Sequence, residues 1–386
     1  MVAFRPKWKR GQDLALISLM IVVVRVLAAL VAAQIGSSFI ARGSRQPVVP
    51  NSLISAFTKW DAGWYIRVAE HGYPSLRSHA FYPAYPLLIR VFSTVFGYAG
   101  GALAVAWIAA VFAVWGVIDV ARRFASPETS LIVGVLFAWN PASIFLVAGY
   151  PEGLLVAAMI WSLRFALDRK WWRAAVLAGA ASCILPQGTV SALVVVVAVI
   201  LSEPRRRRIL RAFLFGAVGE VGLVCLIIYG WITTGNPLVN EKAEKLGWHN
   251  QFTYPFHVVL RQLVMIANSP ASQQVRSVYV LNACAGIFAG AMAAIGIYLC
   301  WRDRRLILPA VLLALGVLIS VITIDIGVDS TARFVLFQAP LYVIGAVCID
   351  KFPKHLRLPL AVNVLVVSSM LAVLYGAMFN FGWWLT

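Results

Sequence analysis

The chain has 386 residues, of which 61% are hydrophobic and only 12% are charged. An average soluble domain is about 45–50% apolar and about 25% charged, so this composition excludes a water-soluble fold. The formal net charge of +18 would suit nucleic-acid binding in a soluble protein. Here the Lys and Arg residues cluster at the ends of apolar runs, where they report membrane topology. We therefore expect membrane lipids, and no nucleic acid, among its partners.

The apolar runs are about 17 to 25 residues long, the length that a helix needs to cross a hydrocarbon core. With the basic clusters placed inside, they predict a cytoplasmic N-terminus and an all-α polytopic membrane protein with about eleven transmembrane helices. No internal repeat is apparent, so we expect a single transmembrane domain over residues 1–386. The expected spans lie at about residues 14–35, 101–120, 131–148, 153–167, two short spans within 174–201, then 209–232, 278–300, 306–323, 334–349 and 358–379.

Two apolar runs do not fit a simple crossing. If residues 81–97 crossed the membrane, the next basic cluster would lie outside; the run also contains Arg90 and paired prolines. We expect a juxtamembrane helix that lies at, or re-enters, the outer interface. Residues 174–201 are too many for one crossing and are interrupted by Pro186 and Gly188. They predict two short helices that return to the same side.

Two polar stretches are expected on the outer face. The first, residues 36–100, includes the interfacial helices and is where we expect catalysis; the second covers residues 233–276. Neither stretch is large enough to be expected to fold alone.

The most distinctive segment is residues 60–73, which begins with Asp61 among the aromatics Trp60, Trp64 and Tyr65. It predicts a short helix on the outer leaflet with Asp61 near its start, where the helix dipole favours a carboxylate. Tyr65 then lies one turn on, on the same face. An interfacial belt formed by Trp60 and Trp64, with Asp61 as an N-cap, would fit the same residues.

A rigid aromatic string, AFYPAYP at residues 80–86, follows and brings the chain back to the same interface. A carboxylate beside aromatic faces at the lipid surface suits a sugar attached to a lipid. This second segment therefore favours a binding site over a simple aromatic belt.

The string WDAGWYIRVAEHGY at residues 60–73, with AFYPAYPLLIR at 80–90, resembles the signature of the PIG-V type (GPI mannosyltransferase II-like) family, which has bacterial members. Further matches follow in the expected order: NPASIF at 140–145 with GYPEG at 149–153, GNPL at 235–238 with Trp248, and RFVL at 333–336 with Pro340 and Leu341. There are departures: the family's TR-x(2)-G appears as ILPQG at 184–188, without the Arg, and the Ser of its YSE is Pro151.

The resemblance implies a GT-C glycosyltransferase of the polyprenyl-phosphate-sugar-dependent kind. Such an enzyme would move a mannosyl residue from polyprenyl-phosphate-mannose to a glycolipid or lipoglycan on the non-cytoplasmic face, by single displacement, without a cofactor. Asp61 would be the base. The phosphate and lipid of the donor would contact Arg333, Arg25 and Arg67. Substrate contacts would come from Trp60, Trp64, Tyr65, Glu70, His71, Tyr82, Asn140, Glu152 and Glu244.

Arg25 also has a structural interpretation. It lies in the middle of the first expected span, where an unpaired Arg costs at least about 2.5 kcal/mol on insertion scales. Glu220, in a later span, is a candidate partner. A buried structural pair and a functional role both remain open.

Other functions remain open as well. A lipid or sugar transporter or flippase could also have intramembrane charges, although such proteins usually show internal repeats and sites near the midplane. A GT-C enzyme could use another sugar, such as arabinofuranose, glucose or an amino sugar. The outer loops have no Asp-x-Asp, so no metal site is predicted. We expect a multi-pass protein of the bacterial inner (plasma) membrane, with its site on the periplasmic face.

Overall fold

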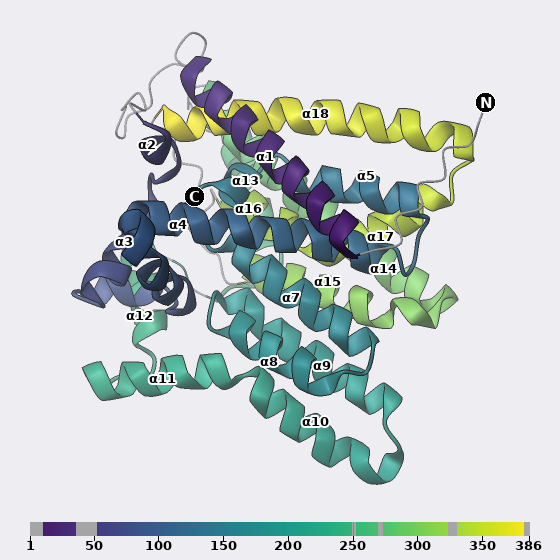
Figure 1. The fold of residues 1–386 in the computed structure, drawn as a ribbon, viewed down its shortest axis with the longest axis horizontal. Coiled ribbons are helices and arrows are strands. Elements are labelled where there is room, and N and C mark those ends of the chain that lie inside the picture. Colours follow the sequence, from purple (N-terminus) through teal and green to yellow (C-terminus); the bar gives the residue numbers. More distant parts are fainter. Residues whose placement is uncertain are drawn as a thin grey trace.

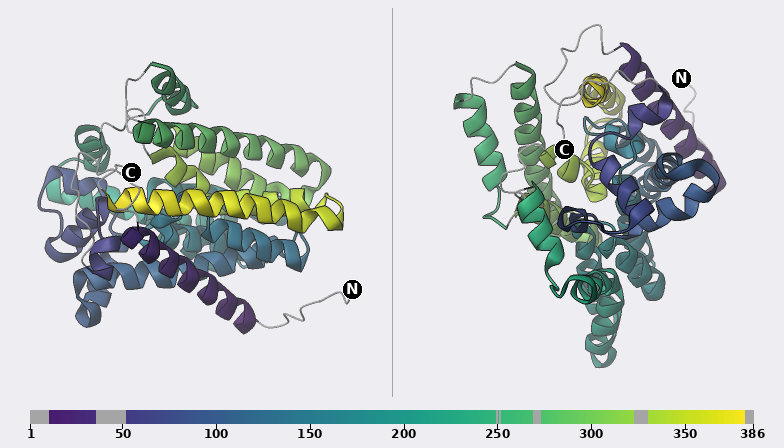
Figure 2. Two further views of the ribbon diagram at one scale, coloured as in Figure 1. Left: turned by 90° about the horizontal axis from the view of Figure 1, so that it is seen from above. Right: turned by 90° about the vertical axis from the view of Figure 1, so that its left-hand side faces the viewer.

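The computed structural model describes residues 11–35, 52–248, 250, 252–268, 273–322 and 330–381. Part of the first predicted outer stretch, residues 36–51, lies outside these ranges. Every regular element in the described ranges is a helix. Most of the helices run roughly along the longest axis of the molecule, while α10 and α11 project from one side (Figures 1 and 2). The predicted all-α architecture is therefore confirmed.

The first half of the chain forms α1 (Gly11–Ile35), α2 (Leu53–Phe57), α3 (Asp61–His71), η2 (Leu76–Ala80), α4 (Ala84–Ala121), α5 (Pro127–Ala138), α6 (Ile144–Val147), α7 (Glu152–Leu167), α8 (Trp171–Ser182), η3 (Pro186–Thr189) and α9 (Val190–Ser202). The second half forms α10 (Arg205–Gly219), α11 (Val221–Thr234), α12 (Val239–Trp248), α13 (His257–Asn268), α14 (Gln273–Arg302), η4 (Arg304–Leu306), α15 (Ile307–Ile322), α16 (Thr331–Leu336), α17 (Ala339–Asp350) and α18 (Lys354–Asn380).

In the described ranges five helices are long and apolar enough to cross a membrane, namely α1, α4, α14, α15 and α18. The pair α10 and α11, bent by 52°, would make a sixth. The count of eleven spans is not confirmed, because several expected spans are short or interrupted helices. The molecule is nonetheless a polytopic bundle of apolar helices.

Both unusual apolar runs contain a break, which the sequence predicts only for residues 174–201. Gly97 has a φ of 68°, in the left-handed region, and separates α4 into two helical parts. Residues 174–201 form most of α8, the 3₁₀ turn η3 and nearly all of α9, and the two α-helices pack against each other. The predicted helical hairpin is confirmed.

Three spans that we expected to be continuous are broken. Residues 131–148 divide into α5 and α6, residues 209–232 bend between α10 and α11, and residues 334–349 divide into α16 and α17. Irregular backbone at membrane depth is tolerated where it is buried in protein. Apolar composition alone does not report such breaks.

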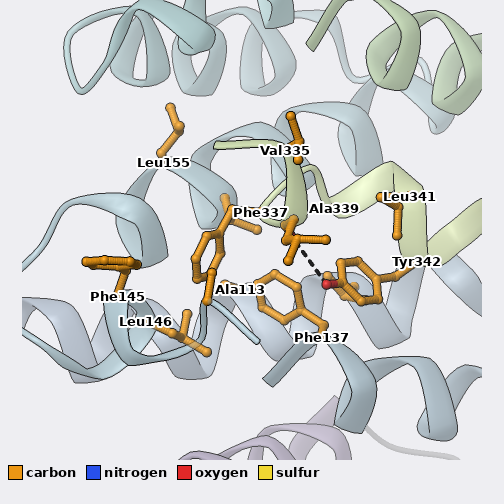
Figure 3. Close-up of a cluster of buried hydrophobic side chains, with 14 of the residues drawn as sticks. Ala113, Phe137, Phe145, Leu146, Leu155, Val335, Phe337, Ala339, Leu341 and Tyr342 are labelled. Carbon is orange, nitrogen blue, oxygen red and sulfur yellow. Dashed lines mark hydrogen bonds between the residues drawn. The ribbon is translucent and has the colours of Figure 1, made fainter. Parts of the chain in front are cut away.

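The core lies where the broken elements meet α4 and α7. The ring of Phe137 packs edge-on against Phe337 at 5.9 Å and against Tyr342 at 5.2 Å between centroids (Figure 3). The hydroxyl of Tyr342 donates to the carbonyl of Leu336 at 2.9 Å, so its polar end is satisfied inside the core. These contacts fix α16 and α17 against the first half of the chain.

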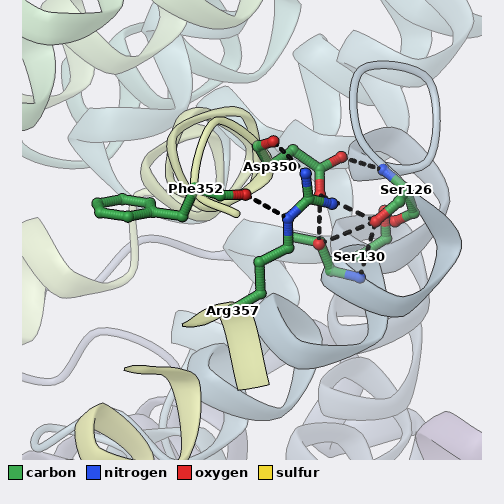
Figure 4. Close-up of polar contacts among 6 residues, drawn as sticks. Ser126, Ser130, Asp350, Phe352 and Arg357 are labelled. Atoms are coloured by element: carbon green, nitrogen blue, oxygen red, sulfur yellow. Dashed lines mark hydrogen bonds and ion pairs between the residues drawn. The ribbon is translucent and has the colours of Figure 1, made fainter. Parts of the chain in front are cut away.

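A polar clamp joins α5, α17 and the start of α18 at the end of the bundle away from α3 and α12 (Figures 1 and 4). The carboxylate of Asp350 accepts from the backbone N–H of Ser126 at 2.5 Å, from the hydroxyl of Thr129 at 2.5 Å and from Nη1 of Arg357 at 2.8 Å. One carboxylate thus caps the first turn of α5 and ties it to the C-terminal helix.

Candidate active site

The site begins at a strained backbone position. Trp60, directly before α3, has a φ of 59°, a region that non-glycine residues rarely adopt. Such strain costs on the order of 1–3 kcal/mol and persists only where surrounding contacts impose it. Here Nε1 of Trp60 donates to the carbonyl of Phe379 at 3.1 Å, and Nζ of Lys59 donates to the carbonyl of Asn380 at 2.6 Å. The C-terminal end of α18 therefore holds the segment that sets the direction of Asp61.

A buried ion cluster forms around Arg333. Its Nη1 donates to Oδ2 of Asp61 at 3.0 Å, and its Nε donates to Oε1 of Glu152. Relative exposures are 8% for Asp61, 1% for Glu152 and 4% for Arg333. The guanidinium matches both carboxylates because its N–H groups form a planar fork.

Aromatic rings enclose the same guanidinium. Cζ of Arg333 lies 4.7 Å from the ring centroid of Tyr150 and 5.1 Å from that of Phe145. The hydroxyl of Tyr150 accepts from the backbone N–H of Asp61 at 3.1 Å and donates to the carbonyl of Lys59 at 3.3 Å. Tyr150 therefore joins the start of α3 to the cation that binds its carboxylate.

The short helix α16 is itself held by two amides. The backbone N–H of Ala332 donates to Oδ1 of Asn282 at 2.7 Å, and Nε2 of Gln262 donates to the hydroxyl of Thr331 at 3.0 Å. These contacts come from α14 and α13, and they position Arg333 on a helix of only six residues. The cluster thus depends on helices from both halves of the chain.

Residues 36–216 match the family model described as Mannosyltransferase (PIG-V). The resemblance to the PIG-V mannosyltransferase family is confirmed. The mouse "GPI alpha-1,6-mannosyltransferase 2" is 28% identical over 162 residues, which cover 39% of this chain and 32% of the mouse protein. The human protein of the same name is 28% identical over 152 residues, 36% of this chain and 31% of the relative. The matched region thus spans about a third of these relatives.

Solved structures show a similar fold over nearly the whole chain. ArnT from Cupriavidus metallidurans, solved bound to undecaprenyl phosphate, matches with a TM-score of 0.51 and 13% identity, covering 93% of this chain and 74% of ArnT. AglB from Archaeoglobus fulgidus, solved with an inhibitory peptide and a dolichol-phosphate, matches with a TM-score of 0.51 and 11% identity, covering 95% of this chain and 56% of AglB. The expected GT-C type of fold is therefore confirmed.

Within the PIG-V region, the aromatic residues predicted to bind substrate pack together. Trp64 stacks on Phe81 at 5.7 Å and meets Trp248 at 5.8 Å between centroids, and Tyr65 meets Phe81 edge-on at 4.8 Å. Tyr65 is buried between these rings, so it supports the start of α3. Tyr82, also buried, lines a neighbouring cavity with Glu244.

Other predicted residues of the PIG-V pattern make their contacts outside the ion cluster. Glu70 and His71 are exposed and 3.6 Å apart, and the exposed Arg67 lies over the ring of Trp64 at 5.2 Å. Asn140 bonds within its own turn, donating to the carbonyl of Phe137 at 2.8 Å and accepting from the backbone N–H of Ala142 at 2.9 Å. These contacts give Asn140 a structural role in the break between α5 and α6.

The sequence suggested Glu220 as a candidate partner of Arg25, but the two residues are not paired. Arg25 is fully buried, its Nε donates to the hydroxyl of Ser143 at 2.8 Å, and its guanidinium lies 5.6 Å from the ring of Trp139. α10 packs on α9 and α8 and α11 packs on α8, whereas α1 packs on α4 and α18, so Glu220 and Arg25 lie in different parts of the bundle. The described contacts of Arg25 therefore favour a structural role.

Sequence reasoning missed Tyr150 and Gln187. Tyr150 stands two residues before Glu152 in GYPEG, so the PIG-V match could have indicated it. Gln187 occupies the turn where the family pattern has its Arg, and only the cavity described below gives it a context. In the described ranges no group of three His, Cys, Asp or Glu residues could hold a metal ion.

Proposed function

We propose that this protein is a membrane glycosyltransferase that moves a mannosyl residue from polyprenyl-phosphate-mannose to a membrane-associated glycolipid or lipoglycan on the non-cytoplasmic face. The observation that carries the proposal is the Asp61 carboxylate, buried and held through Oδ2 by Arg333. A base must be fixed within reach of the hydroxyl whose proton it accepts. The PIG-V match supports the sugar, and the bound lipids of ArnT and AglB support the class of donor.

In the proposed reaction, the acceptor hydroxyl oxygen bonds to the anomeric carbon as the bond from that carbon to the phosphate oxygen breaks. The polyprenyl phosphate leaves with the electron pair, and the hydroxyl proton passes to Asp61. Because Arg333 binds Oδ2, we assign the proton to Oδ1. Binding has already removed the translational and rotational freedom of the reacting groups. The activation free energy of the transfer step is lower because this entropy is not lost again.

Arg333 is better suited to position Asp61 than to bind the donor phosphate. Asp61, Glu152 and Arg333 together have a formal charge of −1, and the guanidinium binds two carboxylates in the described structure. A phosphodiester would be repelled by such a cluster. Arg67, exposed on α3 and six residues after Asp61, is the cation that we assign to the phosphate. Six helical residues span about 9 Å along the axis.

The polyprenyl chain has a suitable place between α4, α7 and α8. A cavity of about 640 Å³ there is lined only by apolar side chains, from Ala84 and Ile184 near the site to Trp115 and Phe165 near the other end of the bundle. Its first lining residue along the chain, Ala84, follows Tyr82 by two positions. We assign the hydrocarbon of the donor to this cavity.

The test is transfer by purified protein in detergent, supplied with labelled polyprenyl-phosphate-mannose and a lipid extract. We expect a new labelled glycolipid, and a loss of about 10²- to 10⁴-fold in rate for Asp61→Asn. The Asn side chain still accepts from Arg333, so folding should persist. The matched control is Asp119→Asn, which breaks the ion pair between Asp119 and Arg164 away from the site. Full activity of Asp61→Asn would exclude Asp61 as the base. If the labelled mannose is never transferred to an acceptor, the result would favour a transporter.

A further inference from the structure

A second cavity lies beside the ion cluster and is polar on one side. Its volume is about 250 Å³, and it lies between α12, the turn η3 and α16. At about 30 Å³ per water molecule, it would hold roughly eight waters, which is room for one sugar ring and little more. Tyr82, Leu185 and Phe334 form apolar walls, and Gln187, Glu244 and Asn250 line the polar side.

Two residues of the polar side carry acceptor atoms that lack partners. Oε1 of Gln187, a residue only 4% exposed, and Oδ1 of Asn250 are buried without a hydrogen-bond partner in the described structure. Nδ2 of Asn250 donates to Oε2 of Glu244 at 2.9 Å. Buried polar atoms normally find partners, so acceptors left open around one cavity point to a ligand that brings donors.

Glu244 has a second sign of a functional site. Burial raises the pKa of its carboxyl to about 7, the hydrogen bond from Asn250 opposes that rise, and the charge of Asp61 adds to it. A perturbed carboxyl in a cleft is a candidate for a functional site.

The cavity shares a wall with each of the two sites already assigned. The ring of Phe334 lines it and lies 5.2 Å from the guanidinium carbon of Arg333, which binds Asp61. Tyr82 and Leu185 line this cavity, whereas Ala84 and Ile184 line the apolar one. The backbone N–H of Ala84 donates to the carbonyl of Cys183 at 3.1 Å and closes the wall between them.

We propose that this cavity receives the sugar ring of the lipid-linked donor, with its hydroxyls donating to Gln187, Asn250 and Glu244 and its apolar face against Phe334 and Tyr82. The inference rests on the proposed function and adds the place of the transferred sugar. Two carboxylates, of Glu241 and Glu244, line the cavity together with no Lys or Arg of the described chain, so a phosphate group is disfavoured there. A hydroxyl-rich neutral ring fits both the charge and the acceptors.

Gly188 explains how Gln187 reaches the cavity. A Cβ at Gly188 would lie 1.9 Å from the carbonyl oxygen of Ala181, so only glycine lets η3 pack this closely on α8. This close approach sets the position of Gln187 at the tip of the hairpin.

The experiment compares binding of polyprenyl-phosphate-mannose with binding of bare polyprenyl phosphate to the full chain in detergent. We expect the unaltered protein to prefer the lipid with the sugar. Gln187→Leu and the more conservative Glu244→Gln should each reduce that preference roughly tenfold. This is the change expected when one hydrogen bond to a buried group is lost. Glu128→Gln, an exposed carboxylate of α5 far from the cavity, is the control.

The outcomes separate this inference from the proposed function. If both variants keep the full preference while Asp61→Asn loses transfer, the cavity assignment is wrong and the glycosyltransferase stands. If affinity for both lipids falls equally, or if only the KM for the acceptor rises, the cavity does not bind the donor sugar. If neither lipid binds the unaltered protein, the donor class and the cavity assignment are both overturned.

Discussion

Arg333 donates through Nη1 to Oδ2 of Asp61 at 3.0 Å while its Nε binds Glu152, so one guanidinium holds two carboxylates that belong to different helices. Removing one partner of a buried ion pair leaves an uncompensated charge, which costs about 3–5 kcal/mol. The cluster is therefore the place where stability and the proposed chemistry depend on the same side chain.

Arg333→Lys should separate positioning from phosphate binding. A single ammonium lacks the planar fork that contacts both carboxylates. If Arg333 positions Asp61, we expect kcat to fall at least tenfold with little change in the KM for the donor. A raised donor KM with kcat preserved would instead restore the phosphate-binding role that the sequence first indicated. Arg333→Met should lower the free energy of unfolding by about 3–5 kcal/mol.

Arg67→Met should show the complementary result. Arg67 is exposed, and its guanidinium contacts the ring of Trp64. If it binds the donor phosphate, the KM for polyprenyl-phosphate-mannose should rise roughly tenfold, because a hydrogen bond to a charged group contributes about 1.5–3 kcal/mol. Raising the salt concentration should increase the donor KM of the unaltered protein more than that of the variant. An unchanged donor KM would remove Arg67 from the site.

Gly188→Ala should destabilise the helical hairpin. Its new Cβ would meet the carbonyl oxygen of Ala181 at 1.9 Å, so the turn must move. We expect a loss of about 1–3 kcal/mol, as for overpacked cores, measured by thermal unfolding in detergent. Gly345→Ala is the matched control, since nothing lies within 4 Å of a Cβ built there. Equal melting temperatures for the two variants would contradict the close packing of η3.

Glu244 should make stability depend on pH. Its pKa rises from 4.5 to about 7 in the fold, so the folded protein holds this proton more tightly than the unfolded chain. The stability contribution is then fully present below about pH 4.5 and is lost as pH rises to about 7. The groups that face it are Asn250, Asp61, Arg333, Tyr82 and Glu241.

The measurement is the melting temperature at about pH 5 and about pH 8 for the unaltered protein and for Glu244→Gln. We expect the unaltered protein to lose more stability between the two conditions than the variant. Parallel shifts in both proteins would show that Glu244 does not titrate in this range.

Asp350→Ala should weaken the polar clamp without affecting the site. Asp350 accepts hydrogen bonds from Ser126, Thr129 and Arg357, and its side chain is 22% exposed (Figure 4). We expect unfolding to become easier by about 2–4 kcal/mol, while the folded fraction keeps its donor KM. Asp303→Ala removes an exposed pair with Arg305 and should cost less than about 1 kcal/mol. A loss as large for Asp303→Ala would show that burial is not the deciding factor.

The sequence by itself determined the helical membrane class, the resemblance to the PIG-V family, the hairpin at residues 174–201 and the segment that contains Asp61. Composition, basic clusters, Pro and Gly positions and local strings carry this information, because each acts within one helix or one turn. Residues 131–148 and 334–349 also contain a proline at each break, Pro141 and Pro340, but their apolar composition alone did not show that they are broken. An apolar run has the same composition whether it crosses the bilayer whole or breaks inside protein.

The tertiary structure alone decided which groups meet. Asp61 and Arg333 are 272 residues apart, and Arg333 and Glu152 are 181 apart. The sequence named all three, yet it assigned Arg333 to a phosphate because nothing local indicated the two buried carboxylates that bind it. Arg25 met Ser143 instead of Glu220 for the same reason. A buried charge takes the partner that packing brings within hydrogen-bond distance, and that distance is set by how the helices cross rather than by their order in the chain.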